Sequence, residues 1–192
     1  MILVSIDPSI TSTSVCYYDA EENKTNIRVY TEKLLVRERG LGPIYLAGLN
    51  LYVNERPKDF IDAYERYNAT TNAIVNDIVQ NTTPDNSIII IEGGALMGHN
   101  LYSIGQFVGM LIGKLYDAGY SIQKTYPSSS WKKDLGLKGN AKKPKLREYA
   151  MGTPLRKLLV ELKRLGITDK KGSFVEDIID SYLIGQAYLN KF

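Results

Sequence analysis

MILVSIDPSITSTSVCYY, residues 1–18, opens the chain with apolar and small residues that run into a single carboxylate, Asp7. Pro8 and Ser9 then turn the chain into a second run, in which Ser or Thr alternates with apolar residues. The pattern predicts a buried strand, a tight turn and a returning strand. A carboxylate at the end of an apolar strand is costly to bury unless it is hydrogen-bonded or binds a cation. Ordinary sheets also contain such carboxylates, so a role for Asp7 needs support from the rest of the chain.

The composition is that of a globular protein, and its charge is uneven. The chain has 192 residues, 44% hydrophobic and 23% charged, which favours a single domain over residues 1–192. The net charge of +3 hides a dense basic segment at residues 132–147, in which Asp134 is the one acidic residue. Residues 156–171 are also basic, although an ordinary solvated helix face explains them equally well. The asymmetry indicates a polyanionic partner.

Two features favour a cytoplasmic protein. The one cysteine, Cys16, has no internal disulfide partner, which is typical of a reducing compartment. The N-terminus does not have the form of a signal peptide, and no apolar run reaches membrane-spanning length. Frequent Lys, Ile, Asn and Tyr suggest an AT-rich genome, so we expect a bacterial cytoplasm or that of a phage-infected cell.

The first half of the chain predicts a meander followed by a helix. Residues 19–24 form a polar turn, and Thr25–Val36 alternates as a third strand of an antiparallel meander. Residues 37–57 have no clear period and are interpreted as a long loop, with at most a short helical piece. Apolar and aromatic residues at helical spacing predict a helix over Asp59–Gln80.

A central strand and a glycine-striped helix follow. Ser87–Gly94 predicts a strand. It contains an uninterrupted run of isoleucines that leads into a second lone carboxylate, Glu92, and such a run is typical of a strand covered on both faces. Leu101–Ala118 predicts a helix with glycine at every fourth position from 105 to 113. Each glycine costs about 1 kcal/mol relative to alanine. The stripe therefore predicts close packing, against the sheet in the simpler interpretation or against a second subunit.

The last part of the chain predicts one strand and three helices. Tyr120–Tyr126 is a fifth strand, and Ser128–Ser130 can cap a short helix that contains Trp131. A basic loop and a helix over Pro154–Leu165 come next. The final helix begins at Ser173, which opens a capping box.

Four carboxylates are expected to meet in space. Asp177 and Asp180 share one face of the final helix. If the strands that end in Asp7 and Glu92 are neighbours and this helix crosses their ends, the four acids converge and need cations. Oxygen ligands favour Mg²⁺ or Mn²⁺ over zinc. Two such ions about 4 Å apart can clamp the attacking and leaving oxygens of a phosphodiester.

On these residues the chain resembles the RuvC-type Holliday junction resolvases of the RNase H-like superfamily, particularly the phage and poxvirus branch. The likeness covers nearly the whole chain in order and spacing. It is carried by Ile6-Asp7-Pro8, Ile90-Ile91-Glu92, Glu176-Asp177-Ile178-Ile179-Asp180-Ser181 and the loop Gly139-Asn140-Ala141-Lys142-Lys143. The resemblance implies an α/β, RNase H-like fold with a mixed five-stranded sheet, a three-stranded antiparallel meander plus parallel strands, flanked by helices.

The resemblance also implies an activity. The chain would be a structure-selective endodeoxyribonuclease of recombination and repair that resolves four-way junctions by paired nicks, leaving 5′-phosphate and 3′-hydroxyl ends. Asp7, Glu92, Asp177 and Asp180 would be catalytic and would bind two Mg²⁺ or Mn²⁺ ions. Lys143 would steady the scissile phosphate. The resemblance also matches Lys132 to a basic contact with the DNA. The charge of the basic segment extends the expected DNA-contacting residues to Lys132, Lys133, Lys138, Lys142, Lys143, Lys145 and Arg147.

Two features depart from the family. Ser9 and Ser14 stand where its opening turn is glycine-rich, and residues 37–57 are longer than usual. Both bear on the junction sequence preference and on the path of the DNA.

A four-way junction is nicked on two symmetry-related strands, so one site per chain implies a homodimer. Leu101–Ala118 is the candidate shared surface. Leu96, Met97 or Tyr102 is a candidate wedge between bases, with a place in the core as the alternative, and His99 is interpreted as a loop residue.

Three other functions remain open from the sequence. A ribonuclease on RNA–DNA hybrids would share the fold and the chemistry. An ATPase of the actin and sugar-kinase class also opens with a strand, an acid and a Ser/Thr-rich turn, but needs two such domains and a nucleotide-binding glycine motif. In a DNA-binding module without catalysis, the four acids would be structural.

Overall fold

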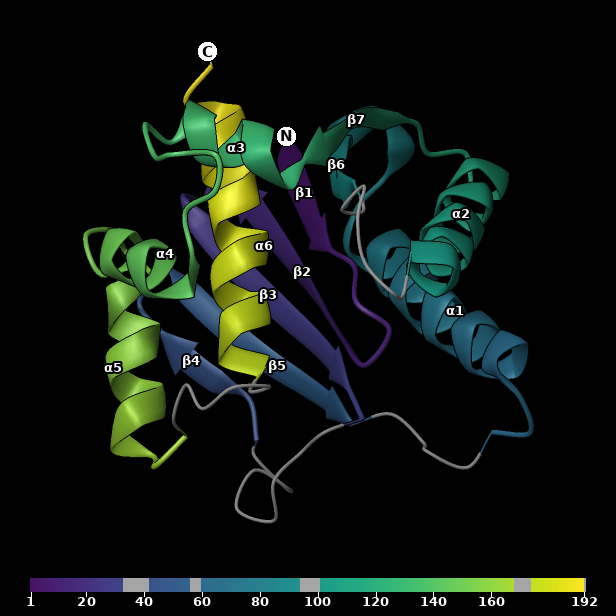
Figure 1. Ribbon diagram of the computed structural model, residues 1–192, viewed down its shortest axis with the longest axis horizontal. Coiled ribbons are helices and arrows are strands. Elements are labelled where there is room, and N and C mark those ends of the chain that lie inside the picture. The colour runs from purple at the N-terminus through teal and green to yellow at the C-terminus, as the bar shows by residue number, and fades with distance from the viewer. Residues whose placement is uncertain (33–41, 56–59, 94–100, 168–173, 192) are drawn as a thin grey trace.

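The computed structural model describes residues 1–32, 42–55, 60–93, 101–167 and 174–191. These residues form a mixed seven-stranded sheet with helices on both faces (Figure 1). The strands are β1 (Ile2–Asp7), β2 (Ser12–Asp19), β3 (Lys24–Thr31), β4 (Ile44–Leu46), β5 (Leu49–Glu55), β6 (Ser87–Gly93) and β7 (Ile122–Pro127). The helices are α1 (Ala63–Asn81), α2 (Leu101–Asp117), α3 (Ser128–Asp134), α4 (Lys143–Ala150), α5 (Arg156–Arg164) and α6 (Phe174–Leu189), with a 3₁₀ turn at Pro84–Asn86.

The strand order is β4-β5-β3-β2-β1-β6-β7. β1, β2 and β3 form the predicted antiparallel meander, and β6 and β7 continue the sheet in parallel with β1. The isoleucines of β6 from Ile89 to Ile91 are fully buried, as expected of an inner strand covered on both faces. The predicted mixed sheet flanked by helices is confirmed.

The prediction of a long loop over residues 37–57 is wrong for its described part. β4 and β5 occupy most of residues 44–55, so the sheet has two more strands than predicted. β5 pairs in parallel with β3 and buries Leu49 and Leu51. The strand signal is weak because β4 has only three residues and the two strands are joined at Gly48, which adopts a φ of +78°. Residues 37–41, 56 and 57 lie outside the described part.

A side-chain cap explains where α1 begins, but α3 begins without one. α1 starts later than predicted because the Asp62 carboxylate accepts a hydrogen bond from the Glu65 amide at 2.8 Å, which makes Asp62 the N-cap. α3 has Pro127 at its N-cap and no side-chain cap, so the predicted serine cap is wrong. Ser173 lies outside the described residues. Among the residues that the structure describes, no helix is long and apolar enough to cross a membrane.

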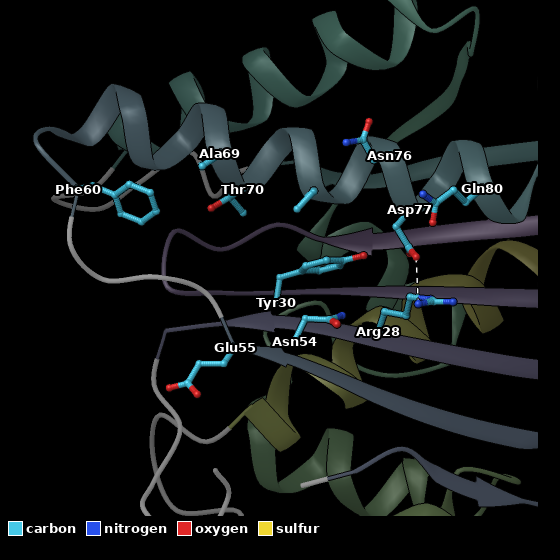
Figure 2. A pocket seen from close by; sticks show the side chains of 11 residues that line it. Arg28, Tyr30, Asn54, Glu55, Phe60, Ala69, Thr70, Asn76, Asp77 and Gln80 are labelled. Atoms are coloured by element: carbon cyan, nitrogen blue, oxygen red, sulfur yellow. Dashed lines mark ion pairs between the residues drawn. The ribbon is translucent and has the colours of Figure 1, made fainter. Parts of the chain in front are cut away.

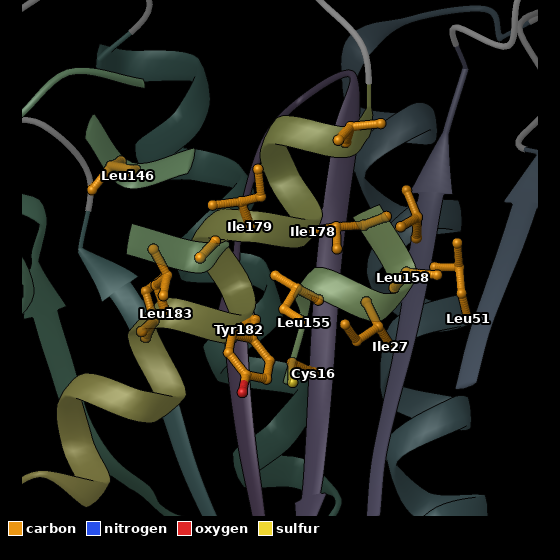
Figure 3. Close-up of a cluster of buried hydrophobic side chains, with 14 of the residues drawn as sticks. Cys16, Ile27, Leu51, Leu146, Leu155, Leu158, Ile178, Ile179, Tyr182 and Leu183 are labelled. Carbon is orange, nitrogen blue, oxygen red and sulfur yellow. The ribbon is translucent and has the colours of Figure 1, made fainter. Parts of the chain in front are cut away.

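Two cores lie on opposite faces of the sheet. α1 and α2 cover one face, where Ile74, Ile78 and Phe107 are fully buried. α3 to α6 cover the other face, and α6 crosses β1, β2 and β3 (Figure 1). In Figure 3, Ile178, Ile179 and Tyr182 of α6 lie among the residues of this second core. Apolar packing therefore holds α6 directly on the strands of the meander.

The glycine stripe of α2 does not pack on the sheet, and the simpler interpretation of it is wrong. Gly105, Gly109 and Gly113 are exposed. A Cβ built on any of the three would meet nothing within 4 Å among the described residues. Phe107, Leu111 and Leu115 on the opposite side of the helix face the core instead. The glycines thus form a smooth helix face that none of the described residues covers.

Candidate active site

Two strand ends bring Asp7 and Glu92 to the same edge of the sheet. β1 and β6 are parallel neighbours, with Ile6 opposite Ile91. The next residue of each strand is a carboxylate, so the two acids leave the sheet side by side. The negative charge of Glu92 accordingly helps to raise the pKa of Asp7. Asp7 is 9% exposed, and Glu92 is half-buried.

Helix α6 brings Asp177 and Asp180 to this edge, and buried serines fix its position on the sheet. The Ser181 hydroxyl is 2.8 Å from the Ser14 hydroxyl, and the Ser5 hydroxyl donates to the Ser181 carbonyl at 2.7 Å. A Cβ at Gly185 would lie 2.8 Å from the Ser5 hydroxyl, so any larger residue would force this hydroxyl to move. Because Ser181 follows Asp180 directly, these contacts set the distance between the carboxylates of α6 and those of the strands.

The charges of the four acids are crowded. Burial, followed by the charges of Glu92, Asp180 and Asp177, raises the pKa of Asp7 well above its ordinary value. Burial raises the pKa of Asp177 to about 7, against the lowering effects of Ser12 and Lys143. Burial also raises the pKa of Asp180, with Glu92 adding to the shift and Lys143 opposing it. A nearby cation would stabilise the ionised forms of Asp7, Asp177 and Asp180, which burial and mutual repulsion disfavour.

Lys143, the first residue of α4, supplies a positive charge. Its ammonium forms an ion pair with Asp180 Oδ2. Burial lowers the pKa of Lys143, but the charges of Asp180 and Asp7 outweigh this effect and raise it overall. Lys143 therefore stays protonated and partly neutralises the acidic cluster. The sequence alone did not predict this pairing, because α4 was interpreted as part of a loop.

The donor set fits a hard divalent cation in chemistry and charge. It consists of carboxylates, of which those of Asp7, Asp177 and Asp180 have raised pKa values, and Asp180 Oδ1 is buried with no hydrogen-bond partner among the described residues. Within the described ranges, however, no three acidic, histidine or cysteine side chains form a ready-made cation site. A cation would therefore have to draw the carboxylates together and take over the neutralising role of Lys143 at Asp180.

Sequence reasoning also missed the partner of Glu92. The Trp131 indole Nε1–H, from α3, donates to Glu92 Oε1 at 3.2 Å. Trp131 was predicted only as part of a short helix. No pattern in the sequence links a tryptophan in one helix to a carboxylate 39 positions earlier in a strand.

The predicted DNA-contacting residues lie on two helices and one turn, and two of them, Lys143 and Lys132, lie close enough to Asp180 to oppose the rise in its pKa. Lys132 and Lys133 end α3, Lys138 and Lys142 lie in the following turn, and Lys143, Lys145 and Arg147 belong to α4. The basic segment is thus mostly helical rather than a loop. Lys132 and Arg147 are half-buried, and the other five are exposed. Lys145 pairs with Glu148 at 2.8 Å, which reduces its availability to a phosphate.

Other predicted features lie apart from the acids or outside the described residues. Leu96, Met97 and His99 are not among the described residues. Tyr102, at the start of α2, is 78% exposed, so it is not a core residue. A cavity of about 350 Å³ between α1 and strands β3 and β5 contains none of the predicted site residues (Figure 2). Its Arg28 and Asp77 already pair with one another at 3.1 Å.

Comparisons with known proteins show which fold carries these acids. No protein-family model and no curated protein matches the chain. Thermus thermophilus RuvC is similar in structure, with a TM-score of 0.57 and 18% identity over 100% of this chain and 96% of that one. The same protein in complex with a Holliday junction substrate has a TM-score of 0.52 and 14% identity, and the match again covers 100% of this chain and 96% of that one. The yeast mitochondrial Holliday junction resolvase has a TM-score of 0.58 and 12% identity, and the match covers 98% of this chain and 77% of that one. The chain therefore has the RNase H-like fold of these resolvases.

Proposed function

We propose that this chain, which shares its fold with RuvC, is a metal-dependent endonuclease that resolves four-way DNA junctions. The observation that supports the proposal best is the gathering of Asp7, Glu92, Asp177 and Asp180 from β1, β6 and α6 at one edge of the sheet. Two basic residues lie beside these acids and match a polyanionic substrate: Lys143 of α4 pairs with Asp180, and the charge of Lys132 of α3 opposes the rise in the pKa of Asp180.

The four carboxylates would hold two Mg²⁺ or Mn²⁺ ions. Once bound, the ions would supply Lewis-acid stabilisation of the attacking water oxygen and of the departing 3′ oxygen, and departure of the 3′ oxygen would leave a 5′-phosphate and a 3′-hydroxyl. The chain contributes the placement of the oxygen ligands, through the β1–β6 register and the serine contacts of α6. Burial of Asp7 and Asp180 keeps bulk water from these ligands.

Lys143 would serve the substrate as well as the acids. Its side chain is 44% exposed, so the ammonium can turn from Asp180 towards a phosphate at the mouth of the site. Lys132, Lys133, Lys138, Lys142, Lys145 and Arg147 would hold the phosphates on either side. Contacts of this kind give affinity without reading sequence and weaken with salt.

The open glycine face of α2 is the proposed dimer surface. Small residues allow close approach of two helix backbones, and the face has no partner among the described residues. A two-fold axis through α2 would give two active sites, as paired nicks on a four-way junction require.

A labelled synthetic four-way junction tests the proposal. The wild-type chain should nick it in symmetry-related strands with Mg²⁺ and not with EDTA, whereas Asp7→Asn should bind the junction without cutting. Linear duplex DNA and an RNA–DNA hybrid are assayed in parallel with the junction, because a hybrid-specific ribonuclease would cut only the hybrid. Normal cutting by Asp7→Asn would overturn the assignment of the acids. ATP turnover in the absence of DNA would point to the ATPase class instead.

A further inference from the structure

Trp131 is the one tryptophan of the chain, and its side chain is fully buried. β7 ends at Pro127, which lies opposite Gly93 of β6, and α3 begins at the next residue. This connection starts α3 at the sheet edge that carries Glu92. Trp131 can therefore reach Glu92 from a helix that packs on both β7 and α6.

The contact between the two side chains has a direction. The indole Nε1–H is a donor only, and Glu92 Oε1 accepts it at 3.2 Å. A buried indole N–H needs a partner, so the fixed ring holds one carboxylate oxygen in place. The other oxygen of Glu92 then has a restricted orientation at the edge that it shares with Asp7.

We propose that Trp131 is a positioning residue, which orients the Glu92 carboxylate for a divalent cation, and that tryptophan emission reports when the cation is bound. The inference rests on the proposed function, because it takes Glu92 as a metal ligand. Groups that hydrogen-bond to metal ligands commonly change metal affinity by 10- to 100-fold when they are removed.

The first test uses the wild-type protein without DNA. Mn²⁺ is titrated while calorimetry measures binding and fluorescence measures tryptophan emission. The heat of binding and the tryptophan emission should follow one binding curve. The reason is that Glu92, which would hold the cation, accepts the hydrogen bond of the indole, and a paramagnetic ion so close to the ring quenches its emission. Binding that leaves the emission unchanged would overturn the inference, and this test requires no substitution of Trp131.

The second test is a double-mutant cycle on Mn²⁺ affinity. Trp131→Phe should weaken Mn²⁺ binding about tenfold while preserving the buried ring. On a Glu92→Gln background the same substitution should have no further effect, since Trp131 acts through the carboxylate. Additive losses would show a general structural role instead. Tyr126→Phe is the matched control. Tyr126 is a buried aromatic residue that lies opposite Glu92 in the β6–β7 register, but its hydroxyl donates to Asp134 and not to Glu92, so removing this hydroxyl should leave the Mn²⁺ affinity unchanged.

The outcomes separate this inference from the function on which it rests. A wild-type chain that neither binds Mn²⁺ nor cuts junctions refutes the proposed function. A chain that binds and cuts, with unchanged Mn²⁺ affinity in Trp131→Phe, refutes only the role of Trp131.

Discussion

Asp177→Asn should make the metal-free protein more stable at pH 8, although it removes a proposed catalytic group. Burial raises the pKa of Asp177 from 3.8 to about 7 in the folded chain. Between these values the folded state binds a proton that the unfolded state has lost, so the free energy of unfolding falls as pH rises from about 4 to 7. A shift of about 3 units, at about 1.4 kcal/mol each, sets an upper limit of about 4 kcal/mol. Relaxation and water entry reduce the expected gain for Asp177→Asn to about 2 kcal/mol.

Urea denaturation in EDTA at pH 4.5 and pH 8 measures this effect. The variant should exceed the wild type by about 2 kcal/mol at pH 8 and by much less at pH 4.5, where the folded wild type keeps the proton. Adding Mg²⁺ at pH 8 should then stabilise the wild type more than the variant, because the cation relieves the same repulsion.

Glu176→Gln is the matched control for this experiment. It removes the same charge from the neighbouring position of α6. Because the charge of Glu176 makes only the smallest contribution to the raised pKa of Asp177, this substitution should change the pH dependence little. If Asp177→Asn instead destabilises the protein equally at both pH values, Asp177 makes a favourable structural contact and the argument from charge crowding is wrong.

Four further substitutions test other parts of the structure. Lys143→Ala should lower junction cleavage about 10²-fold in single-turnover assays. It should cost less than about 1 kcal/mol in the free energy of unfolding of the metal-free protein, because the ion pair of Lys143 with Asp180 is partly exposed. Unchanged cleavage would remove Lys143 from the proposed site. Gly185→Ala should cost about 1–3 kcal/mol in urea denaturation, since its Cβ would lie 2.8 Å from the Ser5 hydroxyl. Gly109→Leu should leave a stable fold but reduce the mass seen by light scattering from dimer to monomer, and a dimer that persists would place the interface elsewhere. Lys138→Ala should reduce the slope of log affinity against log salt by about 1, and an unchanged slope would show that it contacts no phosphate.

The strand ends that carry the acids were predictable because local pattern and physics agree there. An apolar run that stops at a carboxylate identifies Asp7 and Glu92, and the isoleucines of β6 mark it as an inner strand. Neighbouring parallel strands then necessarily bring their ends together. The spacing of Asp177 and Asp180 indicates a common helix face in the same way.

The features that the sequence did not predict depend on long-range packing. β5 exists because β3 offers it a free edge, which no local period shows. The glycines of α2 would suit packing on a sheet or on a partner equally well, and only the folded chain shows that they face away from the sheet. The contact of Trp131 with Glu92 likewise depends on where β7 ends beside β6.

The position of α6 along the chain has a consequence for synthesis in the cell. β1 and β6, which carry two of the four acids, precede residue 94, whereas the other two acids arrive only with α6 after residue 173. A growing chain on the ribosome therefore has only half of the proposed ligand set until α6 emerges and the Ser181 hydroxyl contacts Ser14 of β2. Under the proposed function, a nuclease assembled in this order cannot cut nucleic acid near the ribosome before α6 has been synthesised.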